Sequence, residues 1–263
     1  MLRVGLVGAA GRMGRLLAAA ILAATDLRLV LATEHDDHPL MGRDIGLVAG
    51  VDACGRTLEP LQEGAAAVVD MFVDFSLPAG TRQLLSLAGD RPLVVGTTGL
   101  EPALQEALAA HARRTPVVHA PNFSTGVTLL LELARIAGAQ LAAFDAEIVE
   151  SHHRGKRDAP SGTALALAEA LAAARGTSLA ERARYGRHGD MGARPPGEIG
   201  IHALRGGDVV GEHRIILAGD GERIELAHIA SSRQAFVGGA MRALRWVPGQ
   251  PPGLYTMRDV LGL

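Results

Sequence analysis

The fold is indicated first by the stretch Val7-Gly8-Ala9-Ala10-Gly11-Arg12-Met13-Gly14, which joins an apolar run, Leu2 to Val7, to an Ala/Leu-rich segment, Arg12 to Ala24. The apolar run predicts a buried strand, and the segment after it predicts a helix. Glycines between a strand and a helix permit a tight turn and let the backbone approach a pyrophosphate, which the amides at the helix start then face. The stretch therefore predicts a βαβ unit that binds a dinucleotide.

The acidic residue Glu34 supports this interpretation. The glycine spacing, G-x-x-G-x-x-G, is not the commoner G-x-G-x-x-G, so the motif alone is weakly specific. Glu34, however, lies 20 residues after Gly14 and ends the second predicted strand, Leu27 to Thr33. A carboxylate there can accept hydrogen bonds from the adenosine ribose hydroxyls. A glycine-rich turn that binds nothing and an ordinary surface carboxylate stay open as alternatives.

Strands and helices continue to alternate through the first two thirds of the chain, which is typical of a parallel sheet. We expect a third strand at Val68 to Phe75. Two strand–helix pairs follow: Leu93 to Val95 with Pro102 to Arg113, and Pro116 to His119 with Thr125 to Ala139.

The pattern changes after about Asp145. A strand, Ala146 to Glu150, a polar loop and a helix, Ser161 to Ala174, precede a Gly/Arg/Pro-rich segment that runs to Pro196. These features predict that a second domain begins near this point.

The second domain is expected to contain an open mixed sheet. Between Gly197 and Ala230, alternating segments are separated by Gly206-Gly207 and by Gly219-Asp220-Gly221, both typical of turns that join antiparallel strands. The helix predicted at Gln234 to Trp246 returns to Ala/Met/Leu composition and can pack back on the first domain.

Composition limits the class of protein. The chain has 263 residues, 48% of them hydrophobic and 21% charged, with a formal net charge of -2. It is long enough to bury a core, and its charge favours no nucleic acid partner. The single cysteine, Cys54, excludes an internal disulfide and fits a reducing compartment, so we expect a cytoplasmic protein. The apolar stretch Val127 to Phe144 contains Glu132 and Arg135, so we expect no membrane span.

The densest group of ionisable residues is Glu150-Ser151-His152-His153-Arg154-Gly155-Lys156-Arg157-Asp158-Ala159-Pro160-Ser161-Gly162-Thr163. His152, His153 and Lys156 can donate protons, and clustered positive charge brings a lysine nearer to useful general-acid strength. The same charges attract a dianion. The segment Pro160 to Thr163 supplies a helix N-terminus whose hydroxyls and amides suit a carboxylate.

Other interpretations of this stretch are a solvated basic loop before an ordinary helix cap and a metal site. A metal is disfavoured because adjacent strand residues such as His152 and His153 point to opposite faces and no third ligand stands at a telling spacing. We therefore expect no metal. Cys54 lies in a predicted loop without a paired histidine motif, which favours a resting thiol over a nucleophile.

These motifs resemble those of the 4-hydroxy-tetrahydrodipicolinate reductase family, also called dihydrodipicolinate reductases, over nearly the whole chain. The matching motifs are Val7 to Gly14, Val73-Asp74-Phe75-Ser76, Val95-Gly96-Thr97-Thr98-Gly99, Ala120-Pro121-Asn122-Phe123-Ser124, the segment E-x-H-H-R-x-K-x-D-A-P-S-G-T-A from Glu150, and Ala230-Ser231-Ser232-Arg233. The segment from Glu150 is highly specific. The resemblance implies reduction of 4-hydroxy-tetrahydrodipicolinate to tetrahydrodipicolinate with NADH or NADPH, in the diaminopimelate route to lysine.

The resemblance also implies roles for individual residues. His152 is expected to act as acid and base, and Lys156 to donate a proton after hydride reaches C4 of the ring. The substrate, a small dicarboxylate, is expected to bind to His153, Ser161, Gly162, Thr163 and Thr98. The cofactor is expected to bind to Gly8, Ala9, Ala10, Gly11, Arg12, Met13, Glu34, Gly96, Thr97, Thr98, Ala120, Pro121, Asn122 and Phe123.

The domain organisation implied is a Rossmann-like dinucleotide-binding domain, residues 1–123 and 234–263, and an α+β substrate-binding and tetramerisation domain, residues 124–233, in a homotetramer. Two departures concern the cofactor: His35 follows the acid where relatives that use NADPH often carry Arg, and Leu77 replaces a basic residue found in some relatives. NADH is therefore favoured, or both cofactors are accepted.

Two alternative functions stay open. One is a dinucleotide-sensing regulator on the same fold without turnover, which the presence of His152 and Lys156 disfavours. The other is a different Rossmann reductase or a semialdehyde dehydrogenase, which would need a catalytic cysteine that Cys54 is poorly placed to be.

Overall fold

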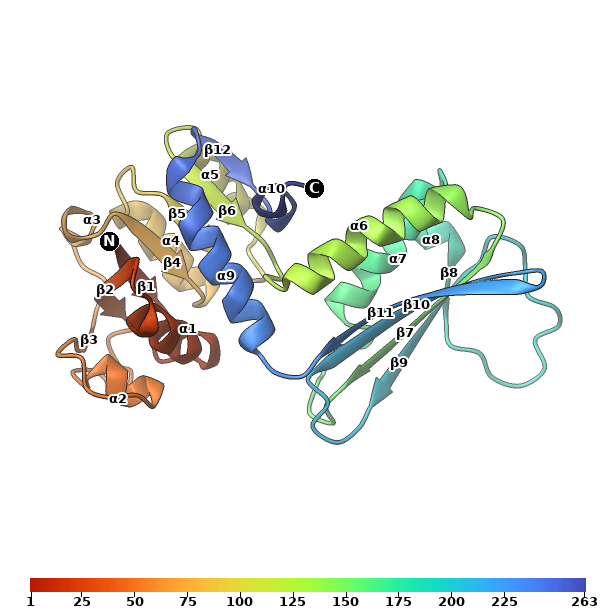
Figure 1. Ribbon diagram of the computed structural model, residues 1–263, viewed down its shortest axis with the longest axis horizontal. Helices are drawn as coiled ribbons and strands as arrows, with labels where there is room; N and C mark the ends of the chain where they lie inside the picture. Colours follow the sequence, from red (N-terminus) through yellow and green to blue (C-terminus); the bar gives the residue numbers. More distant parts are fainter. The chain divides into compact units, whose positions relative to one another are not determined.

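The structure, a computed structural model, describes residues 1–263 and divides the chain into two units. The first unit comprises Met1–Thr125 and Phe236–Leu263, and the second comprises Gly126–Ala235. The first therefore combines the N-terminal half of the chain with its C-terminal end, and both parts are visible in the red-to-yellow and blue segments of Figure 1.

Seven parallel strands form the sheet of the first unit, in the order β12-β6-β5-β4-β1-β2-β3. They are β1 (Leu2–Val7), β2 (Leu27–Thr33), β3 (Leu58–Glu59), β4 (Met71–Asp74), β5 (Leu93–Val95), β6 (Pro116–His119) and β12 (Gly253–Tyr255). The order from β3 to β6 is that of a Rossmann sheet, so the predicted fold class is confirmed for this unit. The chain reverses its direction of progress across the sheet between β1 and β4, and ligands of such sheets bind beside the carboxyl ends of the strands at that point.

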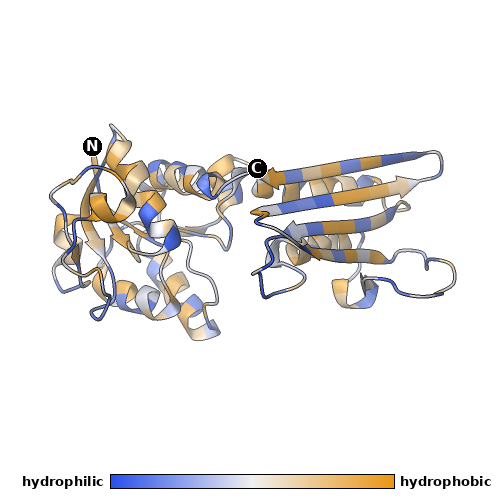
Figure 2. Ribbon diagram, turned by 90° about the horizontal axis from the view of Figure 1, so that it is seen from below, coloured by the Kyte–Doolittle hydropathy of each residue, from blue (hydrophilic) through white to orange (hydrophobic).

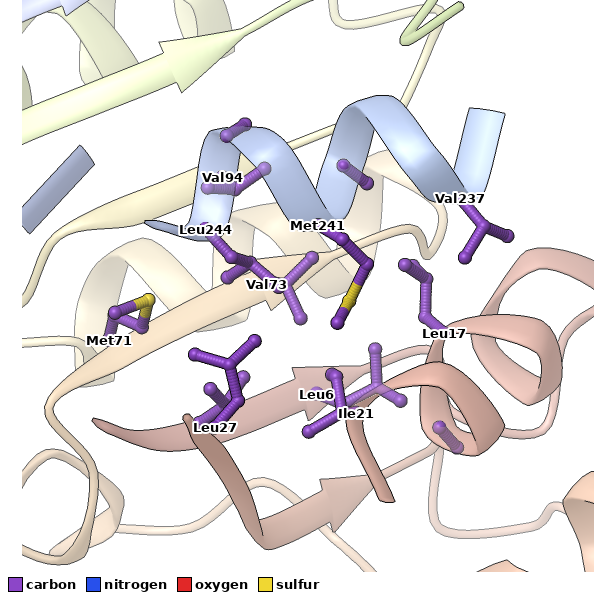
Figure 3. Packing of buried hydrophobic residues seen from close by; sticks show 14 of the residues in the cluster. Leu6, Leu17, Ile21, Leu27, Met71, Val73, Val94, Val237, Met241 and Leu244 are labelled. Carbon is purple, nitrogen blue, oxygen red and sulfur yellow. The ribbon is translucent and has the colours of Figure 1, made fainter. Parts of the chain in front are cut away.

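Helices cover both faces of this sheet, which explains why its strands are apolar on both sides. The helices are α1 (Arg12–Ala23), α2 (Ile45–Ala49), α3 (Ala65–Val68), α4 (Pro78–Leu87), α5 (Pro102–Ala112), α9 (Gln234–Trp246) and α10 (Met257–Leu261), and a 3₁₀ turn, Val247–Gly249, follows α9. One core joins the sheet to α1 and α9, and the other joins it to α4 and α5. Figure 3 shows Met241 and Leu244 of α9 pointing toward Leu6, Val73 and Val94 of the strands.

Most elements of the first unit match the sequence prediction, and the differences are local. The third predicted strand begins at Met71 because Val68 ends α3. The short elements α2, β3, α3, β12 and α10 and the helix α4 were not expected. The strand β12 pairs with β6 from Gly253↔Pro116 to Tyr255↔Val118, so the C-terminal end of the chain completes the edge of the sheet.

The second unit has a five-stranded mixed sheet, in the order β11-β10-β7-β9-β8, as the prediction of an open mixed sheet required. Its strands are β7 (Asp145–His152), β8 (Ala183–Tyr185), β9 (Ile199–Arg205), β10 (Gly211–Gly219) and β11 (Glu222–Ala230), and its helices are α6 (Thr125–Gln140), α7 (Gly162–Ala174) and α8 (Leu179–Arg182). Helices α6 and α7 lie on one face of the sheet (Figure 1). Figure 2 shows the other face, where hydrophilic and hydrophobic residues alternate along the strands.

Two predictions for this unit need correction. Gly206-Gly207 does not join neighbouring antiparallel strands, because β7 lies between β9 and β10, parallel to the first and antiparallel to the second. The strand expected to end at Glu150 continues to His152, so His152 lies on the strand and not in the following loop.

Candidate functional site

A cavity of about 780 Å³ lies at the carboxyl ends of the strands in the first unit. Its wall includes Val7 of β1, Thr33 of β2, Phe75 after β4 and Gly96 after β5, so it spans the point where the strand order reverses. The expected cofactor residues that line it are Gly8, Gly11, Arg12, Met13, Glu34, Gly96 and Thr98. This is the position in which an open parallel sheet binds a dinucleotide.

The loop before α1 has a backbone that requires glycine. Gly8 has a φ of 76°, in the left-handed region. A Cβ on Gly14 would lie 2.1 Å from the carbonyl oxygen of Gly8, so a glycine is needed for α1 to pack on the loop. The N-cap residue Gly11 offers no side-chain cap, which leaves the helix start suited to phosphate oxygens. These residues fit the pyrophosphate of a dinucleotide.

Glu34 is held at the wall of this cavity by two backbone amides. Its Oε2 accepts a hydrogen bond from the amide of Ala10 at 3.1 Å, and its Oε1 accepts one from the amide of His35 at 3.2 Å. The rings of His35 and His38 pack edge to face with centroids 5.1 Å apart, and both rings line the cavity. The carboxylate and two imidazoles therefore stand where an adenosine ribose would be recognised.

The other expected cofactor residues are absent from the wall of the cavity. Ala9, Ala10, Thr97, Ala120 and Phe123 are buried, whereas Asn122 is half-buried and Pro121 is exposed. The segment Ala120-Pro121-Asn122-Phe123 follows β6; the ring of Phe123 packs on Phe75 with centroids 5.2 Å apart. The backbone of this segment lies so close to α9 that a Cβ on Gly239 would be 1.7 Å from the carbonyl oxygen of Phe123. The segment is thus fixed by contacts within the first unit.

Asp74, at the end of β4, links two loops of the cavity. Its buried carboxylate accepts hydrogen bonds from the Ser76 amide at 2.9 Å and from the hydroxyls of Ser76 and Thr81 at 2.5 Å each. The amide of Ser76 also donates to the hydroxyl of Thr97 at 3.1 Å, which ties the loop after β4 to the loop after β5. Burial raises the pKa of Asp74. Asp74 lies in the motif Val73 to Ser76, from which no role for its side chain was predicted.

The second unit brings His152 together with a buried carboxylate. Glu150 and His152 are both buried and point to the face of the sheet that carries α6 and α7, because residues two apart on a strand share a face. The Nδ1 of His152 lies 2.6 Å from Oε2 of Glu150. His153, one residue further along, is partly exposed.

Glu150 has two further partners. Both Nη atoms of Arg205, at the end of β9, donate to the carboxylate at 2.8 Å, and the amide of Ser161 donates to Oε1 at 2.9 Å. Burial acts to raise the pKa of Glu150, but the hydrogen bonds from Arg205, His152 and Ser161 outweigh it and leave the pKa lowered. The group is therefore a carboxylate at neutral pH.

His213, on β10, completes this cluster. Its ring packs edge to face against His152 with centroids 5.2 Å apart, and its Nε2 lies 3.1 Å from Oγ of Ser161. Burial, followed by the charge of His152, lowers the pKa of His213 to about 4. Its Nδ1 is buried without a hydrogen-bond partner, so a charged ring would leave an N–H group without an acceptor. His213 is uncharged at neutral pH.

Lys156 has an acidic neighbour that the sequence argument left out. Its Nζ lies 2.9 Å from the carboxylate of Asp158, and its backbone amide donates to the carbonyl oxygen of His153 at 3.1 Å. Hydrogen bonding from Lys156 lowers the pKa of Asp158. Asp158 therefore neutralises part of the positive charge of this loop.

The N-terminus of α7 lies beside the same cluster. Ser161 is the N-cap residue, and its Oγ accepts a hydrogen bond from the amide of Ala164 at 3.2 Å. A Cβ on Gly162 would meet no atom within 4 Å, so the first helical residue, which Thr163 follows, has open space beside its Cα. Open space at a helix N-terminus suits a carboxylate.

Sequence reasoning missed Arg205 and His213, which lie on β9 and β10. A signal for His213 did exist, because it alternates with Ile215 and Leu217 on the buried face of its strand. A polar residue in such a series is unusual enough to mark a site. No signal in the sequence predicted that Arg205 would face Glu150.

No group of three or more His, Cys, Asp or Glu side chains is arranged to hold a metal ion. No helix has the length and apolar character needed to cross a membrane.

Comparisons with known proteins assign both parts of the chain. Residues 2–123 match the family model described as "Dihydrodipicolinate reductase, N-terminus", and residues 126–261 match the one described as "Dihydrodipicolinate reductase, C-terminus". The 4-hydroxy-tetrahydrodipicolinate reductase of Halorhodospira halophila is 46% identical over 100% of this chain and 99% of that protein. The protein of that name from Magnetococcus marinus is 47% identical over 99% and 98%, respectively.

Solved structures agree. A dipicolinate-bound dihydrodipicolinate reductase from Paenisporosarcina sp. TG-14 superposes with a TM-score of 0.75 at 25% identity and covers 98% of each chain. GenD2 from gentamicin A biosynthesis, solved in complex with NAD, has a TM-score of 0.58 at 16% identity, with 99% of this chain and 90% of GenD2 covered, and shares the fold.

Proposed function

This chain belongs to the dihydrodipicolinate reductase family, and from that premise we propose that it reduces 4-hydroxy-tetrahydrodipicolinate to tetrahydrodipicolinate, in the diaminopimelate route to lysine. The observation that carries the proposal is the Glu150–His152 pair beside the N-terminus of α7, which combines a proton carrier with an anion site. The dipicolinate bound by the Paenisporosarcina protein is a dicarboxylate of the same class.

The cofactor is a nicotinamide dinucleotide held by the first unit. When bound, it supplies the hydride that reaches C4 of the substrate ring. The amides at the start of α1, after Gly11, bind its pyrophosphate, and Glu34 binds the adenosine ribose hydroxyls. Gly96, Thr98 and the segment Ala120 to Phe123 form the nicotinamide side, where the Phe75 and Phe123 rings and Asp74 fix the loops.

The substrate is held and protonated by the second unit. The open N-terminus of α7, at Ser161, Gly162 and Thr163, binds a carboxylate together with His153. Loss of the 4-hydroxyl as water gives an unsaturated ring, and hydride addition to its C4 leaves an electron-rich enamine, so a proton must be supplied. Nε2 of His152 and Nζ of Lys156 are the two groups that supply it.

The residues beside Glu34 favour NADH or allow both cofactors. No arginine follows Glu34, and the exposed Leu77 lines the cavity where a cation could have stood. Nδ1 of His38 accepts a hydrogen bond from the Leu40 amide at 3.2 Å, so Nε2 is the only donor of its uncharged ring. A 2′-phosphate is bound more weakly by such a ring than by a bidentate guanidinium.

The second unit also carries the contacts of a homotetramer. By the strand register, the face of its sheet opposite α7 bears the exposed apolar side chains Leu204 and Ile229 among charged ones such as Arg214 and Glu225. A mixed face of this kind fits a second copy of the chain. Light scattering coupled to size-exclusion chromatography tests the proposal; a mass other than four chains contradicts it. We propose a cytoplasmic location, since the single free cysteine, Cys54, fits a reducing compartment.

The assay follows the absorbance of NADH and NADPH with substrate made in place from pyruvate and aspartate semialdehyde by the condensing enzyme. Substrate-dependent oxidation, faster with NADH or equal for the two cofactors, is expected. Dinucleotide binding without turnover contradicts the proposed activity and leaves a dinucleotide sensor in its place.

A further inference from the structure

Glu150 is a fully buried carboxylate of the second unit with four hydrogen bonds, and the proposed reaction gives it no role. It is completely buried, and each of its oxygens accepts two hydrogen bonds. Oε2 accepts from His152 at 2.6 Å and from Arg205 at 2.8 Å, and Oε1 accepts from Ser161 at 2.9 Å and from Arg205 at 2.8 Å. Three separate parts of the unit, β7, β9 and the start of α7, therefore meet at one carboxylate.

Arg205 keeps this carboxylate ionised. A buried carboxylate alone would favour its neutral form, whereas a guanidinium bonded through two parallel N–H groups stabilises the charge. The pKa of Arg205 is raised by its hydrogen bond to Glu150, and the pKa of Glu150 is lowered. Both shifts therefore favour the charged forms of the pair. Removal of either would leave the other buried and without its counter-charge.

An ionised Glu150 fixes the protons of His152. A carboxylate only accepts hydrogen bonds, so Nδ1 of His152 must carry a proton and Nε2 is the nitrogen that gains and loses one. A ring turned over about its Cβ–Cγ bond would place a carbon against Oε2. Nε2 borders Gly211, where a Cβ would lie 3.1 Å away. The His152 ring therefore has the same orientation in every molecule, with Nδ1 bonded to Glu150 and Nε2 on the other side of the ring.

The groups that face His152 come from four parts of the unit. They are Glu150 on its own strand, Arg205 on β9, His213 on β10 and the Lys156–Asp158 ion pair of the following loop, whose lysine charge also acts on His213. Glu150 is the carboxylate among them that is hydrogen-bonded to the His152 ring. Because His213 is uncharged at neutral pH, the second imidazole does not compete for that anion.

We infer that Glu150 is a positioning residue of the reductase site, held by Arg205, which orients His152 and selects its Nε2 as the nitrogen that transfers the proton. This inference rests on the proposed function. It assigns Glu150 no contact with the substrate: its effect on the reaction passes through His152.

The test compares Glu150→Gln with Glu181→Gln, since Glu181 is an exposed carboxylate of the same unit, on α8. Glu150→Gln should lower kcat on the order of 100-fold, the lower end of what a positioned general acid contributes. The alkaline limb of its pH–rate profile should move by about one unit toward lower pH, since the imidazolium loses its counter-charge. Glu181→Gln should change neither.

Two binding measurements separate positioning from folding. NADH affinity, a property of the first unit, should be unchanged in Glu150→Gln, and the dissociation constant of dipicolinate should stay within a few fold. Arg205→Met should reproduce the shift of the pH profile. An unmoved profile in both variants, or a loss confined to KM, overturns the inference.

A spectroscopic test needs neither turnover nor a stable variant of Glu150. Nitrogen-15 spectra of the imidazole rings, with His152→Gln to assign the signals, should show His152 of the unaltered protein protonated on Nδ1 while Nε2 titrates. A ring protonated on Nε2 alone at neutral pH overturns the inference. Absence of reductase activity would refute the proposed function and leave this result intact, so the two failures are distinguishable.

Discussion

The carboxylate of Glu34 accepts a hydrogen bond from the backbone amide of Ala10, 3.1 Å away and 24 residues earlier in the chain. The end of β2 and the glycine-rich loop after β1 are thereby joined before any ligand binds. A site with its donors and acceptors already in place loses less conformational entropy on binding.

Replacing Glu34 should therefore weaken cofactor binding. Glu34→Ala removes an acceptor for the ribose hydroxyls, and a hydrogen bond to a charged group contributes roughly 1.5–3 kcal/mol, so the dissociation constant of NADH should rise roughly 10- to 100-fold. Fluorescence titration measures it. Glu59→Ala, an exposed carboxylate at the end of β3, is the control. Equal affinity in the Glu34 and Glu59 variants would remove the ribose assignment.

Replacing two neighbouring glycines of α9 by alanine, one at a time, should change the free energy of unfolding in opposite directions. A Cβ on Gly239 would lie 1.7 Å from the carbonyl oxygen of Phe123, whereas one on Gly238 meets nothing within 4 Å. Gly239→Ala should lower the free energy of unfolding by more than about 2 kcal/mol. Gly238→Ala should raise it by roughly 0.5–1 kcal/mol, the helix propensity difference. Urea unfolding measures both; a stable Gly239→Ala protein would contradict the close packing of this helix.

The elements that the sequence predicted correctly are those whose pattern is local. The apolar run of β1, the glycines after it and the first turns of α1 each carry their own signal, and β1 has the predicted bounds. The short strands β3, β8 and β12 have two or three residues each, too few for a period, and exist because a neighbouring strand supplies their hydrogen bonds. Their presence depends on the tertiary structure.

The residues of the candidate site fall into the same two groups: those with a local sequence signal and those that the tertiary structure brings together. His152, Lys156 and Ser161 share one stretch of sequence and one motif, so they could be named in advance. Arg205 reaches Glu150 because β9 pairs beside β7 with Glu150 opposite Ala203, and His213 reaches it because β10 pairs on the other side. The order of strands in a mixed sheet is a property of the whole unit, and the turn residues Gly206-Gly207 indicated a different order.

Lys156 should be needed for turnover and not for cofactor binding. Lys156→Ala removes a proposed proton donor and should lower kcat on the order of 100-fold or more, while the NADH dissociation constant stays the same. The neighbouring Arg157→Ala removes an exposed cation from the same loop and is the matched control for charge. Steady-state rates and NADH titration give the two quantities. If the two variants lose the same activity, the loop acts only through its charge and the specific role of Lys156 is refuted.

The uncharged state of His213 makes the stability of the protein depend on pH. Its pKa is about 4 in the folded protein, against 6.5 for the ordinary group, so between these values the unfolded chain binds a proton that the folded protein does not. Stability must then rise with pH across this window and be lost as the pH falls from 6.5 toward 4, by up to on the order of 3 kcal/mol. His213→Gln should remove this part of the pH dependence, whereas His188→Gln, in an exposed loop, should keep it. Urea unfolding at pH 5 and pH 7.5 gives the difference for each protein. Carboxyl groups titrate in the unaltered protein and in both variants, so the change in unfolding free energy between the two pH values is compared from one protein to the next. An equal pH dependence in His213→Gln and the unaltered protein would show that the ring takes up its proton in the folded state.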